Sequence, residues 1–509
     1  MFVEDAAVGV EGQSPAVTIE QRHAESLFQA RQHPGQRRLC DVQLLGRRGD
    51  VLQLGECDEP LVVTHCHPAH LYLCAERIIG RAKIHFCRAV PARSMVVMPN
   101  GPVAHQAGTR GYRRMTAALC GAGLASFAAM YCTQALLPAL SAHHRIGPAT
   151  AALTVSLTTG ALALSIIPAS VLSERYGRTR VMLISGVASS VIGLLLPFSP
   201  SLGVLVFGRA VQGVALAGIP AVAMALLAEE VDASSLGSAM GRYIAGTTIG
   251  GLAGRIVPSV VVQVGTWRVA LLACSLITLA GTAVFAVLVP RSRFFTPKPA
   301  SVRAALRNLA GHLRNPVLAK LFAVGFVLMG GFVTVYNYLG YRLAARPFGL
   351  APSVVGLLFL LYLVGTGTSV VAGRLADRRG RPLVLGAALP IAVAGLLLTV
   401  PPSLAAIVAG VGVFTGGFFA AHTVASGWVG AVAQRDRAEA SALYLFSYYL
   451  GGSVAGAFGG VLYGVGGWSA TVCFVVVLLM AGAALVALLV RDNGFRIGRR
   501  VVAGVASVK

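Results

Sequence analysis

The stretch GRLADRRGR, residues 373–381, has a near copy in SVLSERYGR, residues 170–178. Both place a carboxylate, several arginines and a glycine in the same order between two long apolar runs. Charged residues make up only 12% of this chain, against about 25% in soluble domains, so two such clusters need an explanation. Their recurrence suggests that one half of the chain repeats the other.

The apolar runs are long enough to cross a membrane. The chain is 56% hydrophobic with a mean hydropathy of +0.73, which is the composition of a membrane protein. Runs of roughly 18 to 25 residues cross the hydrocarbon layer as helices, which satisfy their own backbone, and they lack the alternation of a membrane barrel. We predict an all-α membrane protein with twelve transmembrane helices, at residues 116–138, 149–172, 181–198, 203–228, 239–262, 268–289, 317–339, 353–373, 382–400, 404–432, 440–462 and 468–490.

Residue matches between the halves indicate an internal duplication. Glu174 and Asp377, Gly177 and Gly380, and Arg178 and Arg381 share one offset, as do Gln134 and Asn337; Gly250 with Gly451 and Trp267 with Trp468 share another. The predicted spans therefore form two pseudo-symmetric six-helix bundles, with a cavity between them near the membrane midplane. This construction suits alternating access, in which the bundles rock about a central site.

The chain divides into five predicted parts. Residues 1–114 have no spanning segment, and we expect either a disordered extension or a mis-assigned leader ahead of a start at Met95, Met98 or Met115. Their patch THCHPAHLYLC, residues 64–74, lacks the paired CxxC spacing of a zinc site, so we predict no metal and no cofactor. The other parts are an N-terminal bundle at 115–289, a cytoplasmic linker at 290–316, a C-terminal bundle at 317–490 and a cytoplasmic tail at 491–509.

The basic residues set the orientation. Lys and Arg gather on one side of the predicted spans, and the other side holds only Arg145, Arg268, Arg342 and Arg346. The positive-inside rule places the rich side, with both ends of the twelve-span unit, in the cytoplasm. The net charge of +23 is thus topological, with the lipid bilayer as partner, and we expect no nucleic-acid binding. We expect a monomer in a bacterial inner membrane.

From about residue 110 to 492 the chain resembles the major facilitator superfamily, in its twelve-span drug:proton antiporter branch. The loop GRLADRRGR matches the family signature G-x-L-a-D-r-x-G-r, and its twin has Ser170 for the glycine and Glu174 for the aspartate. A carboxylate at one helix end can meet the dipole of a neighbouring helix. The resemblance implies a gating motif that stabilises the outward-open state, formed by Glu174, Arg175, Gly177, Arg178, Gly373, Asp377, Arg378, Gly380 and Arg381.

Two predicted spans carry an arginine. GRAVQGVALAG, residues 208–218, holds Arg209, Gln212 and Gly213 and resembles the family's R-x-x-Q-G, which implies a role in proton or substrate coupling. A charge inside the membrane costs at least ~2.5 kcal/mol, so it faces a cavity or a partner. A buried structural hydrogen-bond role is the alternative for Arg209.

The fifth span, GRYIAGTTIGGLAGRIVP at residues 241–258, resembles the antiporter signature of this branch, with Arg255 where that signature has proline. Glycines at four-residue spacing let a neighbouring helix approach closely. We predict helix packing for Gly241, Gly246, Gly250, Gly251 and Gly254, and a coupling or substrate role for Arg255.

Polar and aromatic residues recur in the first span of each half. Aromatic walls with a few amides suit an amphipathic organic ligand, so we predict that Tyr131, Gln134, Tyr336, Asn337 and Tyr338 line the cavity. A position in an interfacial belt competes for Tyr338. His422 in the tenth span could titrate, but we favour a histidine that is hydrogen-bonded between helices.

These features predict a secondary active transporter and no enzyme, since GxSxG, HExxH and P-loop motifs are missing. The resemblance favours proton-coupled efflux of a small organic solute, such as a drug-like compound, a sugar or an acid. No carboxylate lies deep in the predicted spans, which disfavours organic cations because a buried cation needs a counter-ion. Neutral or anionic amphiphiles fit Arg209 and Arg255 better. A metabolite uptake symporter and a membrane sensor using residues 1–114 remain alternatives.

Overall fold

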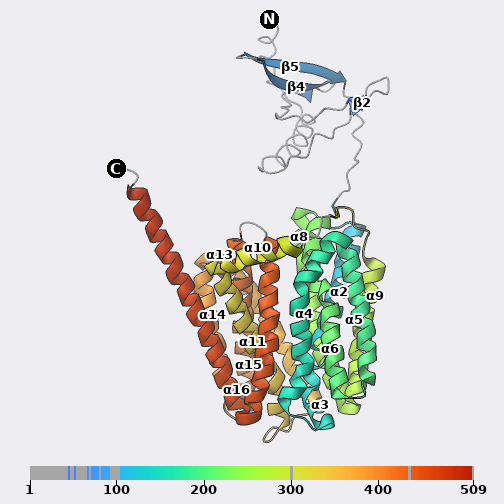
Figure 1. Ribbon diagram of the computed structural model, residues 1–509, viewed down its shortest axis with the longest axis vertical. Coiled ribbons are helices and arrows are strands. Elements are labelled where there is room, and N and C mark those ends of the chain that lie inside the picture. The colour runs from blue at the N-terminus through green and yellow to red at the C-terminus, as the bar shows by residue number, and fades with distance from the viewer. Residues whose placement is uncertain are drawn as a thin grey trace. The chain divides into compact units, whose positions relative to one another are not determined.

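The computed structural model describes residues 104–297, 302–433 and 437–506, together with five strands before them. The chain divides into two compact units, Met1–Gly101 and Pro102–Lys509. The first contains the strands (Figure 1). They are β1 (Leu44–Leu45), β2 (Val51–Leu52), β3 (Cys66–His67), β4 (His70–Ile79) and β5 (Ala82–Pro91).

The strands of the first unit pair antiparallel. β1 pairs with β2, and the second sheet has the order β3-β4-β5. In this sheet β4 and β5 form a hairpin of ten residue pairs, from His70 opposite Pro91 to Ile79 opposite Ala82. The expected extension at 1–114 thus contains strands where the structure describes it. The side chains of the His and Cys patch at 64–74 lie outside the described residues.

The second unit is helical in all its described elements apart from a single β-bridge. Its first half contains α2 (Arg110–Tyr131), η2 (Gln134–Leu136), α3 (Leu137–His144), α4 (Pro148–Tyr176), α5 (Arg178–Leu195), η3 (Leu196–Phe198), α6 (Leu202–Leu216), α7 (Gly218–Glu230), α8 (Ala233–Val264) and α9 (Trp267–Leu288). Its second half contains α10 (Val302–Arg314), α11 (Pro316–Ala344), α12 (Pro352–Leu357), η4 (Leu358–Leu361), α13 (Tyr362–Arg379), α14 (Arg381–Leu397), α15 (Leu404–Val432) and α16 (Arg437–Ala506).

The helices agree with the predicted spans. In the described residues, 10 helical segments are long and apolar enough to cross a membrane. α14 is a shorter apolar helix of 17 residues, and α16 bends at Gly466 and at Gly467, whose φ is 59°. With α14 counted and α16 taken as two helices, each of the twelve predicted spans has its helix. The second unit begins before the predicted boundary at residue 115, because α2 starts at Arg110.

Local chemistry sets the ends of these helices. The side chains of Thr109, Ser201 and Thr266 each accept a backbone N–H of the first turn, which satisfies a donor that the helix itself leaves free. Gly177 and Gly380 separate α4 from α5 and α13 from α14 with φ of 98° and 90°. A side chain at these two positions is strained, which explains the glycine in both copies of the motif.

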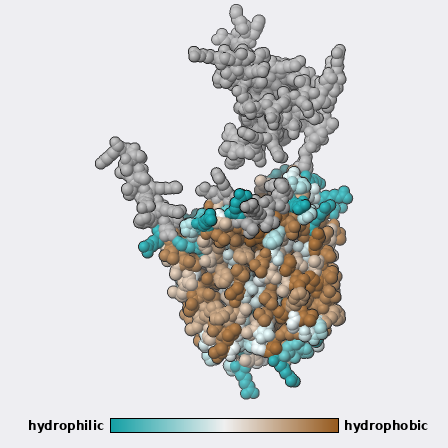
Figure 2. All heavy atoms as spheres, in the orientation of Figure 1, coloured by the Kyte–Doolittle hydropathy of each residue, from teal (hydrophilic) through white to brown (hydrophobic). Residues whose placement is uncertain are grey.

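The outer surface of the helical unit is apolar. Figure 2 shows hydrophobic residues over the middle of the visible face and hydrophilic residues toward its two ends. Phe198, Phe207 and Ile184 are 74%, 71% and 67% exposed. An apolar surface of this extent requires lipid in contact with it. The helical unit is therefore a multi-pass membrane domain.

Glycines bring α8 against α2. A Cβ on Gly246 or Gly250 would clash with the backbone carbonyl of Cys120 or Leu124, and a Cβ on Gly254 would lie 2.6 Å from the Ala128 oxygen. This close approach confirms the predicted packing of the three residues. Gly241 is exposed and has nothing within 4 Å, so its predicted packing role is wrong. Gly251 instead leaves room for the Arg255 guanidinium.

We predict that Gly250→Ala destabilises the protein by about 1–3 kcal/mol, the usual cost of overpacking. The matched substitution Gly241→Ala removes a flexible residue from an exposed helix surface and leaves stability unchanged or slightly higher. Thermal unfolding of both purified variants in the same detergent measures the difference. An equal effect of the two substitutions contradicts the packing argument.

Candidate functional site

Three polar side chains form a hydrogen-bonded chain across the two halves. Arg255 Nε in α8 donates to Gln134 Oε1 at 2.7 Å, and Gln134 Nε2 in η2 donates to Asn337 Oδ1 in α11 at 2.8 Å. All three are at most 3% exposed. Gln134 and Asn337 are the matched residues of the duplication, so the structure brings this predicted pair into direct contact.

Aromatic rings surround the Arg255 guanidinium. Its Cζ lies 4.0 Å from the ring centre of Tyr131, 4.9 Å from Tyr362 and 5.3 Å from Phe359. The first ring belongs to α2, and the other two come from η4 and α13 of the second half. Cation–π attraction in a desolvated place contributes about 2 kcal/mol. The arginine therefore lies between the halves, enclosed by rings from both.

The aromatic wall continues through the second half. Phe332 stacks on Phe418 with ring centres 3.8 Å apart, and the predicted cavity residue Tyr336 hydrogen-bonds Thr415 at 2.8 Å. His422 Nδ1 lies 3.0 Å from Tyr444 Oη, which confirms a hydrogen bond between α15 and α16. The contributions of Phe332 and Phe418 could not be predicted from the sequence, because phenylalanines are common in the spans and only their convergence in space distinguishes these two.

Tyr338 lies apart from this wall. Its hydroxyl donates to the Gly456 carbonyl at 2.6 Å and its ring stacks on Tyr463 at 5.4 Å. The side chain is fully buried between α11 and α16. The structure therefore supports neither the predicted cavity position nor the alternative of an interfacial belt, and Tyr338 joins two helices of the second half.

Arg209 satisfies backbone carbonyls at a helix break. Its guanidinium donates to the carbonyl oxygens of Ala129 at 2.8 Å, Met130 at 2.7 Å and Thr154 at 3.1 Å, and to the Gln212 side chain. α2 ends at Tyr131, so its last carbonyls have no helical partner. These contacts favour the structural role that was the alternative for Arg209.

The other residues of the fourth-span motif also join helices. Gln212 Nε2 donates to the Ser189 carbonyl at 3.0 Å, and a Cβ on Gly213 would clash with the Thr158 carbonyl of α4. The motif as a whole therefore holds α6 against α2, α4 and α5.

The two ends of the helical unit carry different loops. The motif end carries the loops at Gly177 and Gly380, and the distal end carries the loops at 145–147 and 345–351. α10 lies at the motif end and α3 at the distal end (Figure 1).

At the distal end the halves are joined. Tyr341 Oη donates to the Leu137 carbonyl at 2.9 Å and lies 2.7 Å from Ser141 Oγ. A cavity of about 90 Å³ remains between the halves on this side of the molecule, lined by Gln134, Pro138, Ser259, Tyr336, Val355 and Phe359 among others. Such a space holds a few water molecules and is far smaller than a typical ligand pocket. The distal side is closed in this conformation.

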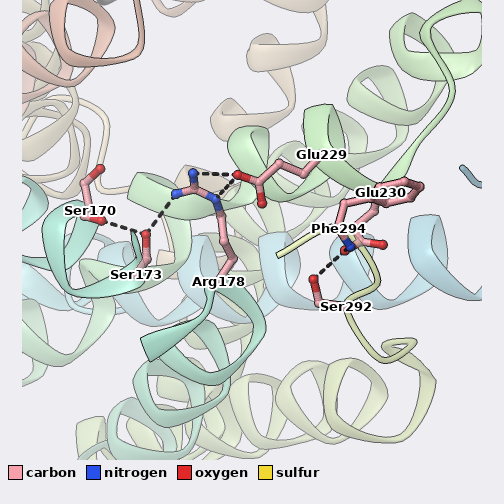
Figure 3. A network of polar contacts seen from close by, with 7 residues as sticks. All are labelled: Ser170, Ser173, Arg178, Glu229, Glu230, Ser292 and Phe294. Atoms are coloured by element: carbon pink, nitrogen blue, oxygen red, sulfur yellow. Dashed lines mark hydrogen bonds and ion pairs between the residues drawn. The ribbon is translucent and has the colours of Figure 1, made fainter. Parts of the chain in front are cut away.

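The first copy of the predicted gating motif forms an ion pair at the motif end. Arg178 Nε and Nη2 lie 2.8 and 2.7 Å from Glu229 Oε1, and Nη1 donates to Ser173 Oγ at 3.0 Å (Figure 3). Glu174, the carboxylate expected in this role, makes no ion pair in the described part of the chain. Two adjacent acidic residues in AEEVD, residues 228–232 at the end of the fourth span, are the sequence feature that could have indicated Glu229 as the partner.

The second copy has another arrangement. Asp377, Arg378 and Arg381 lie at the surface and at its margin, and among the residues the structure describes they take part in no ion pair. Gly373 has open space around it, and Arg175 of the first copy is exposed beside Tyr176. Among the described residues, only the first copy of the motif forms an ion pair, and its partner is Glu229, which lies outside the motif.

The neighbouring residue Glu230 forms hydrogen bonds with two other segments of the chain. Its Oε1 accepts the hydroxyl of Ser292 (Figure 3). The same oxygen accepts the backbone N–H of Arg293 at 2.8 Å. The backbone of His105 pairs with the same turn, because its N–H donates to the Glu230 carbonyl at 2.8 Å and its carbonyl accepts from Asp232 at 3.1 Å. The start of the linker and the residues before α2 are thus fixed to the turn between α7 and α8.

This membrane fold, with two duplicated sets of helices about a polar and aromatic centre, defines a solute transporter. The Major Facilitator Superfamily model matches residues 119–345 and 321–502, and the chain belongs to this family. It is a secondary transporter of small solutes and not an enzyme.

Particular relatives agree with this assignment. The chain is 41% identical over 394 residues to the inner membrane transport protein YnfM of Escherichia coli (strain K12), covering 77% of this chain and 93% of YnfM. It is 40% identical over 385 residues to the uncharacterized MFS-type transporter YybF of Bacillus subtilis (strain 168), covering 76% and 95%. A shorter match, 28% over 180 residues and 35% of this chain, is to the multi-drug resistance efflux pump PmrA of Streptococcus pneumoniae, of which it covers 44%.

A solved structure supports the same fold. The bacterial homolog of the human lysosomal transporter Spinster, in an inward-facing and occupied conformation, superposes with a TM-score of 0.61 at 16% identity. The match covers 75% of this chain and 98% of that one.

We predict a measurable coupling between Arg178 and Glu229. Their side chains are 13% and 32% exposed, so the pair is partly screened and a coupling free energy of about 1 kcal/mol is expected. A double-mutant cycle of Arg178→Ala and Glu229→Ala, read by thermal unfolding, measures it. The cycle of Arg178→Ala with Glu174→Ala is the control and yields about zero; an equal coupling there contradicts the observed pairing.

We predict that acid loosens the segment before α2. Burial and the nearby Arg293 lower the pKa of His105 below its usual value of 6.5, while Glu230 partly opposes them. A lowered pKa in the folded state means that the stabilisation is complete above pH ~6.5 and is lost as the pH falls through the lowered value. The fall in thermal midpoint between pH 7.5 and pH 5 is smaller in His105→Gln than in the wild type. Identical pH profiles contradict this role.

Proposed function

We propose that the chain exports a small organic solute in exchange for protons by alternating access. The observation that carries the proposal is the hydrogen-bonded chain of Arg255, Gln134 and Asn337, which joins the two halves between aromatic walls. These hydrogen bonds join the two halves, so they can form only in some relative positions of the halves. A solute that replaces one of them therefore changes the populations of the conformations.

The cross-half contacts support this mechanism. Ser453 Oγ donates to the Ser156 carbonyl at 2.7 Å, and Gly356 packs directly on the side chain of Ser259. With the Tyr341 contact they gather at mid-span and at the distal end. Solute therefore enters this conformation from the motif end, the side that the basic residues assign to the cytoplasm. A site loaded from the cytoplasm suits export, and the partial similarity to an efflux pump agrees with it.

Proton exchange needs a titratable group in the spans. In the described spans the carboxylates lie at helix ends, as Glu229 and Asp377 do. His422 lies within α15, where it is hydrogen-bonded to Tyr444 of α16 and its ring centre lies 4.5 Å from that of Tyr448. An imidazole can take up and release a proton, and His422 touches the aromatic wall through Phe418. We assign it the proton.

We predict that export is lost when the cross-half chain is cut. Gln134→Ala removes the partner of both Arg255 and Asn337, and a lost hydrogen bond to a charged group changes rates by about tenfold or more. Flux of a panel of labelled organic solutes into inverted vesicles, with and without a pH gradient, measures it. Arg180→Gln, an exposed loss of charge outside the motif, is the control with normal flux.

Two outcomes contradict parts of the proposal. Solute accumulation only in right-side-out vesicles makes the chain an uptake transporter. Flux that keeps its response to the pH gradient in His422→Gln excludes this histidine as the proton carrier.

A further inference from the structure

The Arg255 guanidinium is buried with most of its hydrogen-bonding capacity unused. It is 3% exposed, and it donates from Nε to Gln134 and from Nη1 to the Gly251 carbonyl at 2.7 Å. Among the described residues, Nη2 makes no hydrogen bond and no carboxylate pairs with the guanidinium. A buried charge without a counter-ion is costly. The rings around it compensate only in part.

The direction of the hydrogen bonds leaves a second donor free. An arginine can only donate, so Gln134 must turn its oxygen to Arg255 and its NH₂ to Asn337. Asn337 then accepts with its oxygen, and its own Nδ2 is left over. This nitrogen is buried without a partner, as is Ser156 Oγ, and both lie near Gly456. The centre of the molecule thus offers free donors from Arg255 Nη2, Asn337 Nδ2 and the Ser156 hydroxyl.

Arg209 shows what a structural arginine looks like in the same protein. It is completely buried, yet each nitrogen of its guanidinium has an acceptor and three of these acceptors are backbone carbonyls. Arg255 has one backbone acceptor, in its own helix. In the described residues neither arginine has a carboxylate partner, but only Arg255 has a guanidinium nitrogen without an acceptor.

We propose that Arg255 and Asn337 form the recognition site for a carboxylate on an organic solute with an aromatic or otherwise apolar body. This inference rests on the proposed transport function and names its substrate class. The planar guanidinium suits a carboxylate geometrically, and the free Asn337 N–H₂ offers a further donor to the solute. The rings of Tyr131, Tyr362 and Phe359 receive the apolar body.

Other solute classes fit less well. An organic cation would add a second positive charge beside Arg255 in a place of low polarity, which is strongly unfavourable. A neutral solute would leave the guanidinium without a counter-ion. Only an anion neutralises the charge and uses the free donors at once.

Binding of three isosteric probes to the purified full-length protein in nanodiscs tests the proposal. Benzoate, benzamide and benzylamine differ in charge at nearly constant shape, and thermal stabilisation together with calorimetry measures their binding. Benzoate binds and the other two do not. Arg255→Gln weakens benzoate at least about tenfold, the loss expected for a hydrogen bond to a charged group, while Arg255→Lys retains the preference for benzoate over benzamide. Absence of benzoate binding to the wild type overturns the proposal.

A second variant covers the case in which Arg255→Gln does not fold. Asn337→Asp keeps the acceptor for Gln134, removes the free donor and adds a negative charge. It weakens benzoate binding by about tenfold or more, since the added carboxylate neutralises the positive charge of Arg255 and repels the anion. Unchanged benzoate binding in Asn337→Asp overturns the proposal. Arg180→Gln, which removes an exposed positive charge, binds benzoate as the wild type does.

Binding and flux separate this inference from the proposed function. If benzoate binds through Arg255 and no carboxylate of the panel is carried in vesicles, the anion site stands and transport by this route fails. If neutral or cationic solutes are carried in a manner that depends on Gln134 and benzoate does not bind, transport stands and the carboxylate site fails.

Discussion

Inside a bilayer, polar groups must find their partners within the protein, because hydrocarbon offers none. Because α2 ends at Tyr131, its last carbonyls have no hydrogen-bond donor within the helix. The fully buried Arg209 supplies donors to the carbonyls of Ala129 and Met130. The break in turn allows η2 to present Gln134 to the other half. The central site therefore depends on a hydrogen-bonded helix end several residues away.

The same constraint explains why Arg255 differs from Arg209. Gln134 accepts one hydrogen bond from Arg255 and donates one to the Asn337 oxygen. The Asn337 N–H₂ group at the end of this hydrogen-bonded chain therefore has no acceptor in the described residues. Buried donors without partners are uncommon in proteins. In a transporter, a solute group that joins and leaves in each cycle is such a partner.

At the motif end, water screens the charged groups, so each ion pair contributes less to stability than it would inside the bilayer. The Arg178–Glu229 pair and the Glu230 turn hold the linker, the start of α5 and the segment before α2 together on one half. The equivalent Asp377 cluster lies open. Two copies of one motif at the same end of the molecule thus make different contacts in one conformation.

Much of the fold could be predicted from the sequence. The spans, the duplication, the paired Gln134 and Asn337, and the glycines at 177 and 380 follow from local hydrophobicity, spacing and backbone freedom. These properties act over a few residues, so they can be read along the chain. The partners of charged side chains could not be predicted. Arg178 meets Glu229 in place of Glu174, Gly241 packs on nothing, and Arg209 binds carbonyls. These depend on which helix faces fold together, and only the tertiary structure decides that.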